Sequence, residues 1–270
     1  MKIYLAGENG KKRIIAPEIQ NATVPCRGRP VADGGGGYDP IIRTHKPFIL
    51  ESFYYVDEDT ERLLPYFGDF LLDSGAFTFM QGNHKGKINW DEYVERYASF
   101  INKNKIEKFF ELDIDSVVGY DEVLRLRKKL EKLTGRQSIP VWHISRGYAE
   151  FLKIAEEYPY IAVGGIVSKE IKPDKYGVFP KMIQDAHKRG SKIHGLGFTN
   201  LKLLPQIHFD SVDSTAWTTG NRFGFIYRFD GKTMTKTDAP KGHRLADSRK
   251  VALINYTEWI KFQKWAVTHL

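Results

Sequence analysis

Carboxylates recur at the ends of short apolar runs in this sequence. The run at 209–214, FDSVDS, holds Asp210 and Asp213 three positions apart. Side chains alternate between the two faces of a strand, so these acids point opposite ways and only one can face a site. We expect that acid to be Asp213, because it lies nearer the C-terminal end of the run. Asp210 would then serve structure or face solvent.

Other apolar runs also end in residues that could contribute to a functional site. These are Glu51, Asp73, Asp113 with Asp115, His143, Gly164 with Gly165, and Gly195 with Gly197. Carboxylates are depleted in strands and costly to bury unpaired, so their repetition indicates a shared site. Structural alternatives remain open for each: a turn at Asp73, a cap at Asp113 for a helix near Gly119, and a core hydrogen bond at His143. The glycine pair could end a strand or let a ligand approach the backbone.

The chemistry such acids could perform is covalent catalysis at a glycosidic carbon. Two carboxylates that meet without a metal-ligand set suit a covalent mechanism, in which one attacks C1′ and the other handles protons. We therefore expect an enzyme that needs neither a metal nor a cofactor.

The elements that must position these residues alternate between strands and helices. Apolar runs predict eight strands, at 2–7, 48–52, 70–75, 109–115, 139–143, 161–165, 192–197 and 209–214. Helical periodicity predicts helices after Trp90 and at 121–133 and 148–157. This alternation favours parallel pairing, and eight strands can close an irregular (β/α)8 TIM barrel whose chemistry gathers at the C-terminal strand ends. A doubly wound open sheet is the competing fold.

The sequence changes in character after residue 220. Alternating residues around Asp230 and Gly231 predict a β-hairpin insertion at about 221–240, and a closing helix is expected at about 249–268. We expect one domain over 1–270, without a zinc subdomain. The Gly-rich patch at 34–37 lacks the Lys and Ser/Thr of a phosphate-binding loop.

Composition limits the class of protein. Apolar residues make up 41% of the 270 residues, and no apolar run approaches the ~20 needed to span a bilayer. The N-terminus does not resemble a secretion signal, and the single cysteine, Cys26, excludes a disulfide framework and suits a reducing compartment. We therefore expect a cytoplasmic protein with no membrane partner. A net charge of +8 is compatible with a nucleic-acid partner or a merely soluble surface.

Four motifs together resemble the tRNA-guanine transglycosylase superfamily: LLDSGAF (71–77), IAVGGIVSKE (161–170), HGLG (194–197) and VDSTAWTTGNRFG (212–224). The resemblance implies a barrel enzyme that exchanges guanine in a polynucleotide for a 7-deazaguanine. It implies that Asp213 is the nucleophile of a covalent glycosyl-enzyme intermediate, and that Asp73 is the general acid/base.

The same resemblance implies a set of base-binding residues. Phe77 would stack on the base, Asp113 would bind its amidine-like edge with Asp115 as a rival, and the backbone of Gly164 and Gly165 would read the carbonyl edge. His143 stands where the family usually has Gln, which leaves base selectivity open, since a neutral imidazole offers one donor and one acceptor. The motifs also assign substrate contacts to Ser74, Leu196 and Gly197.

This sequence also differs from the tRNA enzymes of the family, and the differences bear on whether the substrate is DNA or tRNA. The tRNA enzymes carry a Cys-rich zinc site after the hairpin, whereas residues 237–250 hold no cysteine. This pattern looks more like the DNA-acting 7-deazaguanine transglycosylases of phages and bacteria, so DNA is favoured and tRNA, as in queuine- or archaeosine-type exchange, is the alternative. Candidate phosphate contacts, or members of a solvated basic face, are Arg222, Arg228, Lys232, Lys236 and Arg244.

Two other functions remain in competition. The opening MKIYLAG also resembles nucleoside deoxyribosyltransferases, which act on free nucleosides, and a non-catalytic nucleic-acid-binding barrel is the second rival. The sequence does not indicate which 7-deazaguanine is used, which nucleotide context is selected, or whether the chain self-associates.

Overall fold

The computed structural model describes residues 1–7, 45–75, 78, 88–238 and 248–270, with two compact units. The terminal unit comprises 1–49, 58–69 and 197–270, and the central unit comprises 50–57 and 70–196. Strands β2 (Phe48–Ser52) and β3 (Asp69–Asp73) run across a boundary between the units in the sequence. The predictions for Phe77, Arg244 and the Gly-rich patch lie outside the described residues. Within the described part, no helix combines the length and apolarity that a membrane crossing requires.

The central unit is built on parallel strands. Its further strands are β4 (Val141–Trp142), β5 (Tyr160–Val163) and β6 (Lys192–Gly195), and β5 pairs in parallel with both of the others. Single parallel bridges join Leu72 of β3 to Phe109, and Phe110 to Ile139. Strand segments and helices thus alternate along this unit, which confirms the parallel α/β class.

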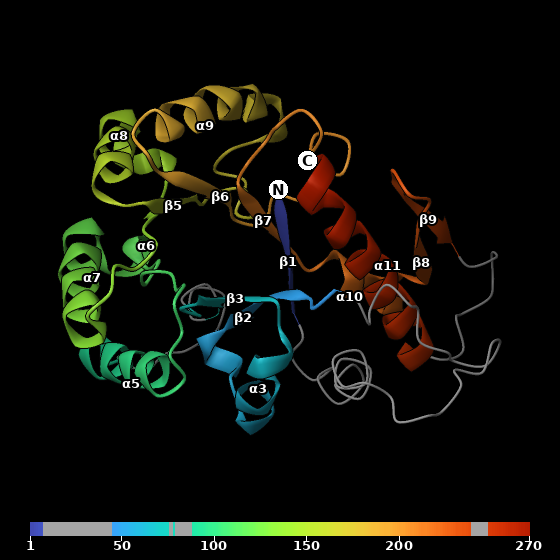
Figure 1. Cartoon of the computed structure of the whole chain (residues 1–270). Coiled ribbons are helices and arrows are strands. Elements are labelled where there is room, and N and C mark those ends of the chain that lie inside the picture. Colours follow the sequence, from blue (N-terminus) through green and yellow to red (C-terminus); the bar gives the residue numbers. More distant parts are fainter. Residues whose placement is uncertain (8–44, 76–77, 79–87, 239–247) are drawn as a thin grey trace. The chain divides into compact units, whose positions relative to one another are not determined.

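Helices follow the strands of this unit, and the three that the sequence predicts, after Trp90, at 121–133 and at 148–157, are present. They are α5 (Trp90–Lys103), α6 (Asp115–Val118), α7 (Tyr120–Thr134), α8 (Gly147–Glu157) and α9 (Phe179–His187), with 3-10 turns at Phe53–Tyr55, Ile144–Arg146 and Pro173–Val178. Figure 1 shows α5 beside α7 and α8 beside α9. Asn89 caps α5 by accepting a hydrogen bond from the Glu92 amide at 3.2 Å.

Helix α5 is hydrogen-bonded to the backbone at the strand ends of the central unit. Its predicted apolar stripe (Tyr93, Val94, Tyr97, Ala98 and Ile101) is buried, as expected. The Tyr97 hydroxyl lies 3.1 Å from the carbonyl oxygens of both Leu72 and Phe110, and the Tyr93 hydroxyl donates to the Ser74 carbonyl at 2.6 Å. These tyrosines therefore tie the helix to the backbone just where β3 ends.

Several predicted strands are shorter than expected, and the run at 109–115 differs most. Of the run 109–115, only Phe109 and Phe110 form parallel bridges, and helix α6 already begins at Asp115. Asp113 caps neither helix: α6 follows Ile114 and α7 follows Gly119 without a side-chain cap. The chain turns early because Ile114 leaves the extended conformation, so Asp113 and Asp115 lie in a loop and at a helix start.

The terminal unit pairs strand β1 (Lys2–Ala6) with β7 (Ser211–Ser214) in parallel, with Tyr4 opposite Asp213. Its helices are α3 (Glu58–Leu63), α10 (Ala216–Phe223) and α11 (Ser248–His269), with a 3-10 turn at Leu64–Tyr66. The predicted hairpin is present as the antiparallel strands β8 (Phe225–Phe229) and β9 (Met234–Asp238). It begins later than about 221, because residues up to Phe223 belong to α10.

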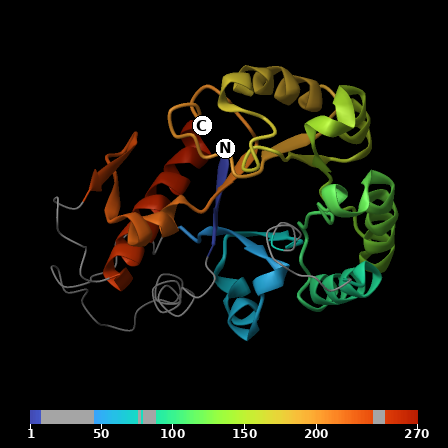
Figure 2. The same ribbon diagram turned by 180° about the vertical axis from the view of Figure 1, so that it is seen from behind.

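Helix α11 is the helix predicted at about 249–268. It is hydrogen-bonded to β1 and β2 through Gln263 and to β8 through Asn255. Gln263, fully buried, accepts from the Phe48 amide at 2.9 Å and donates to the carbonyl oxygens of Phe48 and Ile3. Asn255 accepts from the Tyr227 amide at 2.7 Å. A Cβ at Gly220 would lie 2.0 Å from the Asn255 side-chain nitrogen, so only glycine fits there. Both views show α11 alongside β8 (Figures 1 and 2).

Candidate functional site

A buried ion-pair network lies in the central unit, at the residues that follow Phe110 and β4. Glu111 has no exposed surface and accepts hydrogen bonds from the Val141 amide at 2.8 Å, Arg127 Nε at 2.5 Å and Arg146 Nη1 at 3.1 Å. Both arginine side chains are also buried, at 4% and 2% exposure. One carboxylate thus binds two guanidinium groups away from water, which is tolerable only because its oxygens are well satisfied.

Arg146 connects this buried network to Asp113 and Asp115, the acids that were predicted to bind the base. Its Nε donates to Asp115 Oδ2 at 3.0 Å, its Nη2 lies 3.9 Å from Asp113 Oδ1, and its guanidinium lies over the Tyr120 ring, 4.3 Å from the ring centre. Burial acts to lower the pKa of Arg146, but Glu111, Asp115 and Asp113 outweigh burial and raise it. Arg146 therefore stays charged and orients Asp115.

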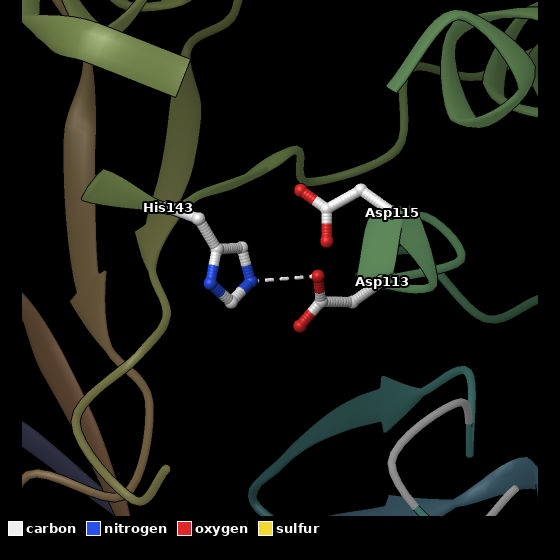
Figure 3. A group of neighbouring side chains, drawn as sticks. All are labelled: Asp113, Asp115 and His143. Atoms are coloured by element: carbon white, nitrogen blue, oxygen red, sulfur yellow. Dashed lines mark hydrogen bonds and ion pairs between the residues drawn. The ribbon is translucent and has the colours of Figure 1, made fainter. Parts of the chain in front are cut away.

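His143 lies between two carboxylates. Its Nε2 is 2.7 Å from Asp113 Oδ1, and its Nδ1 is 3.1 Å from Glu170 Oε2. Figure 3 shows the imidazole facing Asp113, with the Asp115 carboxylate beside them. The ring comes from the end of β4, Asp113 from the segment before α6, and Glu170 from the loop after β5. The structure thus brings together three of the predicted site residues, Asp113, Asp115 and His143.

The charge of this group follows from its surroundings. Burial alone would lower the pKa of His143, but the hydrogen bond and charge of Asp113, together with Asp115 and Glu170, raise that pKa to about 9. Burial also raises the pKa of Asp113, against the lowering effect of His143 and Arg146. The two shifts pull the shared proton in opposite directions. We place it on His143, because the further carboxylates Asp115 and Glu170 also favour an imidazolium.

The glycine pair after β5 makes room for this arrangement. A Cβ at Gly164 would lie 2.7 Å from both Cε1 and Nε2 of His143, and a Cβ at Gly165 would lie 3.1 Å from Cβ of Glu170. Gly165 also has a φ of +77°, which favours glycine. The space predicted for a ligand against this backbone is therefore occupied by two side chains of the protein.

Asp113, Asp115 and His143 also form a group that could approach a cation, since one ligand atom from each lies within 4.8 Å of the others. The sequence indicated no such set. A divalent cation would have to displace the proton of His143 and share Asp115 with the charged Arg146. The donor set therefore fits an ion-pair network better than a metal centre.

Asp73, the predicted acid/base, ends β3 in the central unit. Its Oδ2 accepts a hydrogen bond from the Gly75 amide at 3.0 Å, so its side chain does form the turn that the sequence allowed as an alternative. The neighbouring Ser74 is fully buried, and within the described part of the chain its hydroxyl has no hydrogen-bond partner. A half-buried carboxylate next to an unsatisfied hydroxyl can take part in ligand binding.

Asp213, the predicted nucleophile, lies in β7 of the terminal unit. It is 8% exposed, and its Oδ1 accepts a hydrogen bond from the Gly197 amide at 2.6 Å. The Gly197 amide thus orients Asp213, whereas the motif resemblance implies a substrate contact at Gly197. The Leu196 amide donates to the Val163 carbonyl in the central unit. Asp210 lies just before β7, and its carbonyl accepts from the Lys2 amide.

The predicted phosphate contacts differ in their surroundings. Arg228 lies 3.8 Å from Glu258, and the Lys236 ammonium lies over the rings of Phe225 and Tyr227. Lys232 is exposed at the hairpin turn, where Asp230 accepts from its amide at 2.9 Å. The side chain of Arg222 is outside the described part. Two of these cations therefore have partners within the hairpin and α11, while their exposed positions stay compatible with phosphate binding.

Sequence reasoning missed Glu111, Arg127, Arg146 and Glu170. Glu111 had a readable signal, because Glu111, Asp113 and Asp115 alternate in FFELDID. Glu170 lies inside the quoted motif IAVGGIVSKE but carries no local feature that links it to His143. Nothing in the sequence pairs Arg127 with Glu111, since the two lie on different elements.

This chain matches known proteins at the level of solved structures. No family model matches it, and no curated protein matches it. Similar solved structures come from pyruvate carboxylase of Rhizobium etli. Its carboxyl transferase domain with pyruvate has 16% identity and a TM-score of 0.43, with 82% of this chain and 40% of that chain covered. The same domain in a second structure has 14% identity and a TM-score of 0.44, with 99% and 48% covered.

The enzyme crystallised without acetyl coenzyme-A has 14% identity and a TM-score of 0.43, with 99% of this chain and 29% of that chain covered. This chain spans less than half the length of each of these structures. Similarity at this level transfers neither fold nor activity, so the class of protein rests on the chain's own residues: a parallel α/β protein with a charged cluster at its strand ends.

Proposed function

We propose that this chain is a transglycosylase that replaces guanine in DNA with a 7-deazaguanine, such as 7-cyano-7-deazaguanine, through a covalent glycosyl-aspartate intermediate. The observation that carries the proposal is Asp213: a nearly buried carboxylate at a parallel strand end, with one oxygen oriented by the Gly197 amide. A carboxylate held in this way is suited to attack on an anomeric carbon. The motif resemblance and the Asp113–His143 pair support the same reading.

The proposed reaction has two steps. An Asp213 oxygen attacks C1′ of the target nucleotide, the bond from C1′ to the base breaks, and Asp73 gives a proton to the departing guanine. The incoming 7-deazaguanine then loses a proton to Asp73 and attacks C1′, and the ester to Asp213 breaks. The reaction requires both acids to reach one anomeric carbon.

The polymer is proposed to be DNA, with tRNA as the alternative. The absence of cysteine in residues 237–250 supports the DNA-acting branch of the family that the motifs resemble. A target base within a duplex must be flipped out of the stack, which costs a few kcal/mol and favours open or mismatched sites.

The test is incorporation of label. The purified protein is incubated with radiolabelled guanine or 7-cyano-7-deazaguanine and with either duplex DNA or bulk tRNA. We expect label in DNA, with loss of incorporation in Asp213→Ala and in Asp73→Ala, and retention in the neighbouring control Asp210→Asn. Label in tRNA alone would assign the other polymer. Turnover of free deoxynucleosides without labelling of either polymer would favour a small-substrate enzyme.

A further inference from the structure

We propose that strand β9 is a self-association edge, at which two copies of this chain join their hairpins into one antiparallel, four-stranded sheet. The partner at this edge is a second copy, related to the first by a two-fold axis that passes beside Thr237. The assembly lies outside the predicted catalytic acids and does not depend on the proposed base exchange.

The outer edge of β8 is covered by side chains of helix α11. The Tyr227 amide donates to Asn255 Oδ1 and the Phe229 amide donates to Glu258 Oε2, each at 2.7 Å. These amides therefore point away from β9, although Tyr227 lies directly opposite Lys236 of that strand. In an antiparallel ladder, such residues belong to the cross-strand pairs that exchange no hydrogen bonds. One edge of the hairpin is thus closed within the chain.

The outer edge of β9 is open. The pairs of Lys236 with Tyr227 and of Asp238 with Phe225 exchange no hydrogen bonds, so the N–H and C=O groups of Lys236 and Asp238 point outward. Within the described residues, these outward backbone groups have no hydrogen-bond partner, and positions 235–238 are all exposed. Figures 1 and 2 show β9 on the side of β8 away from α11. An unpaired edge of this kind is a template for a further strand.

The sequence of this edge is complementary to itself. Two antiparallel β9 strands centred on Thr237 set Lys236 of each copy directly opposite Asp238 of the other. Both residues direct their backbone groups outward, so each such pair can exchange two backbone hydrogen bonds. Opposite charges directly across a sheet stabilise the pairing, and like charges destabilise it. A pairing centred on Lys236 or on Asp238 would set like charges against each other, so the charges favour the register centred on Thr237.

The Lys236 side chain is held on the face of the hairpin that this pairing needs. Its ammonium lies 4.5 Å from the centre of the Phe225 ring and 5.5 Å from that of Tyr227. Asp238 lies on the same face, because it is two residues further along the strand. A lysine on an edge strand discourages pairing with other chains. Here Asp238 offsets that effect for a second copy of β9, but not for a strand of unrelated sequence.

The first test measures the register by disulfide formation. In the full chain with Cys26→Ser, which removes the single native thiol, Thr237→Cys is compared with Thr235→Cys. In the proposed pairing the two copies of position 237 are directly opposite, with Cα atoms about 4.5 Å apart, which is within the range of a disulfide. The two copies of position 235 are offset by four residues, so their Cα atoms are about 14 Å apart.

Glutathione disulfide serves as the oxidant, and each intermolecular bond formed reduces one glutathione disulfide to two glutathione molecules. Thr237→Cys should give a covalent dimer, and Thr235→Cys should stay monomeric. No dimer in Thr237→Cys, or equal dimer yields from the two variants, overturns the proposal.

The second test measures association without a cross-link, by sedimentation velocity of the full chain from about 1 μM to about 1 mM. The wild type should pass from monomer to dimer over this range. Asp238→Lys sets lysines opposite each other and should raise the dissociation constant of the dimer by about tenfold. The double variant Lys236→Asp, Asp238→Lys exchanges the charges and should restore association. Glu157→Lys, which changes the net charge equally at the exposed end of α8, is the control and should leave the dissociation constant unchanged.

Two results of the sedimentation experiment overturn the proposal. A wild type that stays monomeric throughout this range would leave the β9 edge to a different partner. Equal dissociation constants for Asp238→Lys and Glu157→Lys would place the dimer contact elsewhere on the chain. Neither result bears on base exchange, and a lack of label in every polymer would leave the self-association edge standing.

Discussion

Replacing Glu111 by Gln tests whether the buried network holds the central unit together. Glu111 is fully buried and is bonded to the Val141 amide and to the guanidinium groups of Arg127 and Arg146. Gln keeps the shape of the side chain but removes its charge, and its amide nitrogen then faces a guanidinium donor. Glu111→Gln therefore leaves two buried cations without their shared counter-ion.

The expected magnitude follows from those contacts. Breaking a buried ion pair by removing one partner costs about 3–5 kcal/mol, because an uncompensated charge stays buried. We expect the free energy of unfolding to fall by about 4 kcal/mol. Unfolding entropy is about 2.1 cal/mol/K per residue, so over 270 residues this is a fall in Tm of about 7 °C.

Thermal denaturation followed by circular dichroism measures this fall. Glu107→Gln, an exposed acid on the same segment, is the matched control and should change the free energy by less than about 0.5 kcal/mol. The double variant Glu111→Gln, Arg127→Gln should lose less than the sum of the single losses, because one unpaired cation is gone. A fall in Tm of under about 2 °C for Glu111→Gln would refute the claim that these charges are buried and mutually dependent.

Three further outcomes are expected. Gly164→Ala should lower the free energy of unfolding by about 1–3 kcal/mol and shift the NMR signals of His143, because its Cβ would lie 2.7 Å from that ring; unchanged signals would contradict the packing. Gln263→Leu should cost about 2–4 kcal/mol in urea unfolding, since it leaves the Phe48 amide and the Ile3 carbonyl unpaired. The pKa of His143 is raised in the folded state, so its contribution to stability is complete below pH 6.5 and is lost as pH rises through about 9; the Tm advantage of the wild type over His143→Gln should shrink across that range, and a constant difference would count against it.

Local patterns in the sequence determined the elements. The apolar stripe of α5 follows from helical periodicity, and the β8–β9 hairpin follows from alternation around Asp230 and Gly231. Both signals lie within a few residues of chain, so no distant contact is needed to read them. The same locality explains the error at 109–115, where an apolar alternating run does not reveal that the chain turns into α6 at Asp115.

The partners within the candidate site were decided by tertiary structure. His143 and Asp113 are 30 positions apart, His143 and Glu170 are 27 apart, and no periodicity links them. The sequence placed Asp113, Asp115 and His143 at strand ends as separate candidates. Only the tertiary packing brings His143 and Asp113 close enough to share a proton. The packing also places the His143 ring against Gly164, where the sequence predicted that a ligand could approach the backbone. The physical reason is that a side chain's charge state depends on the groups that surround it in space, and those come from segments far apart in the sequence.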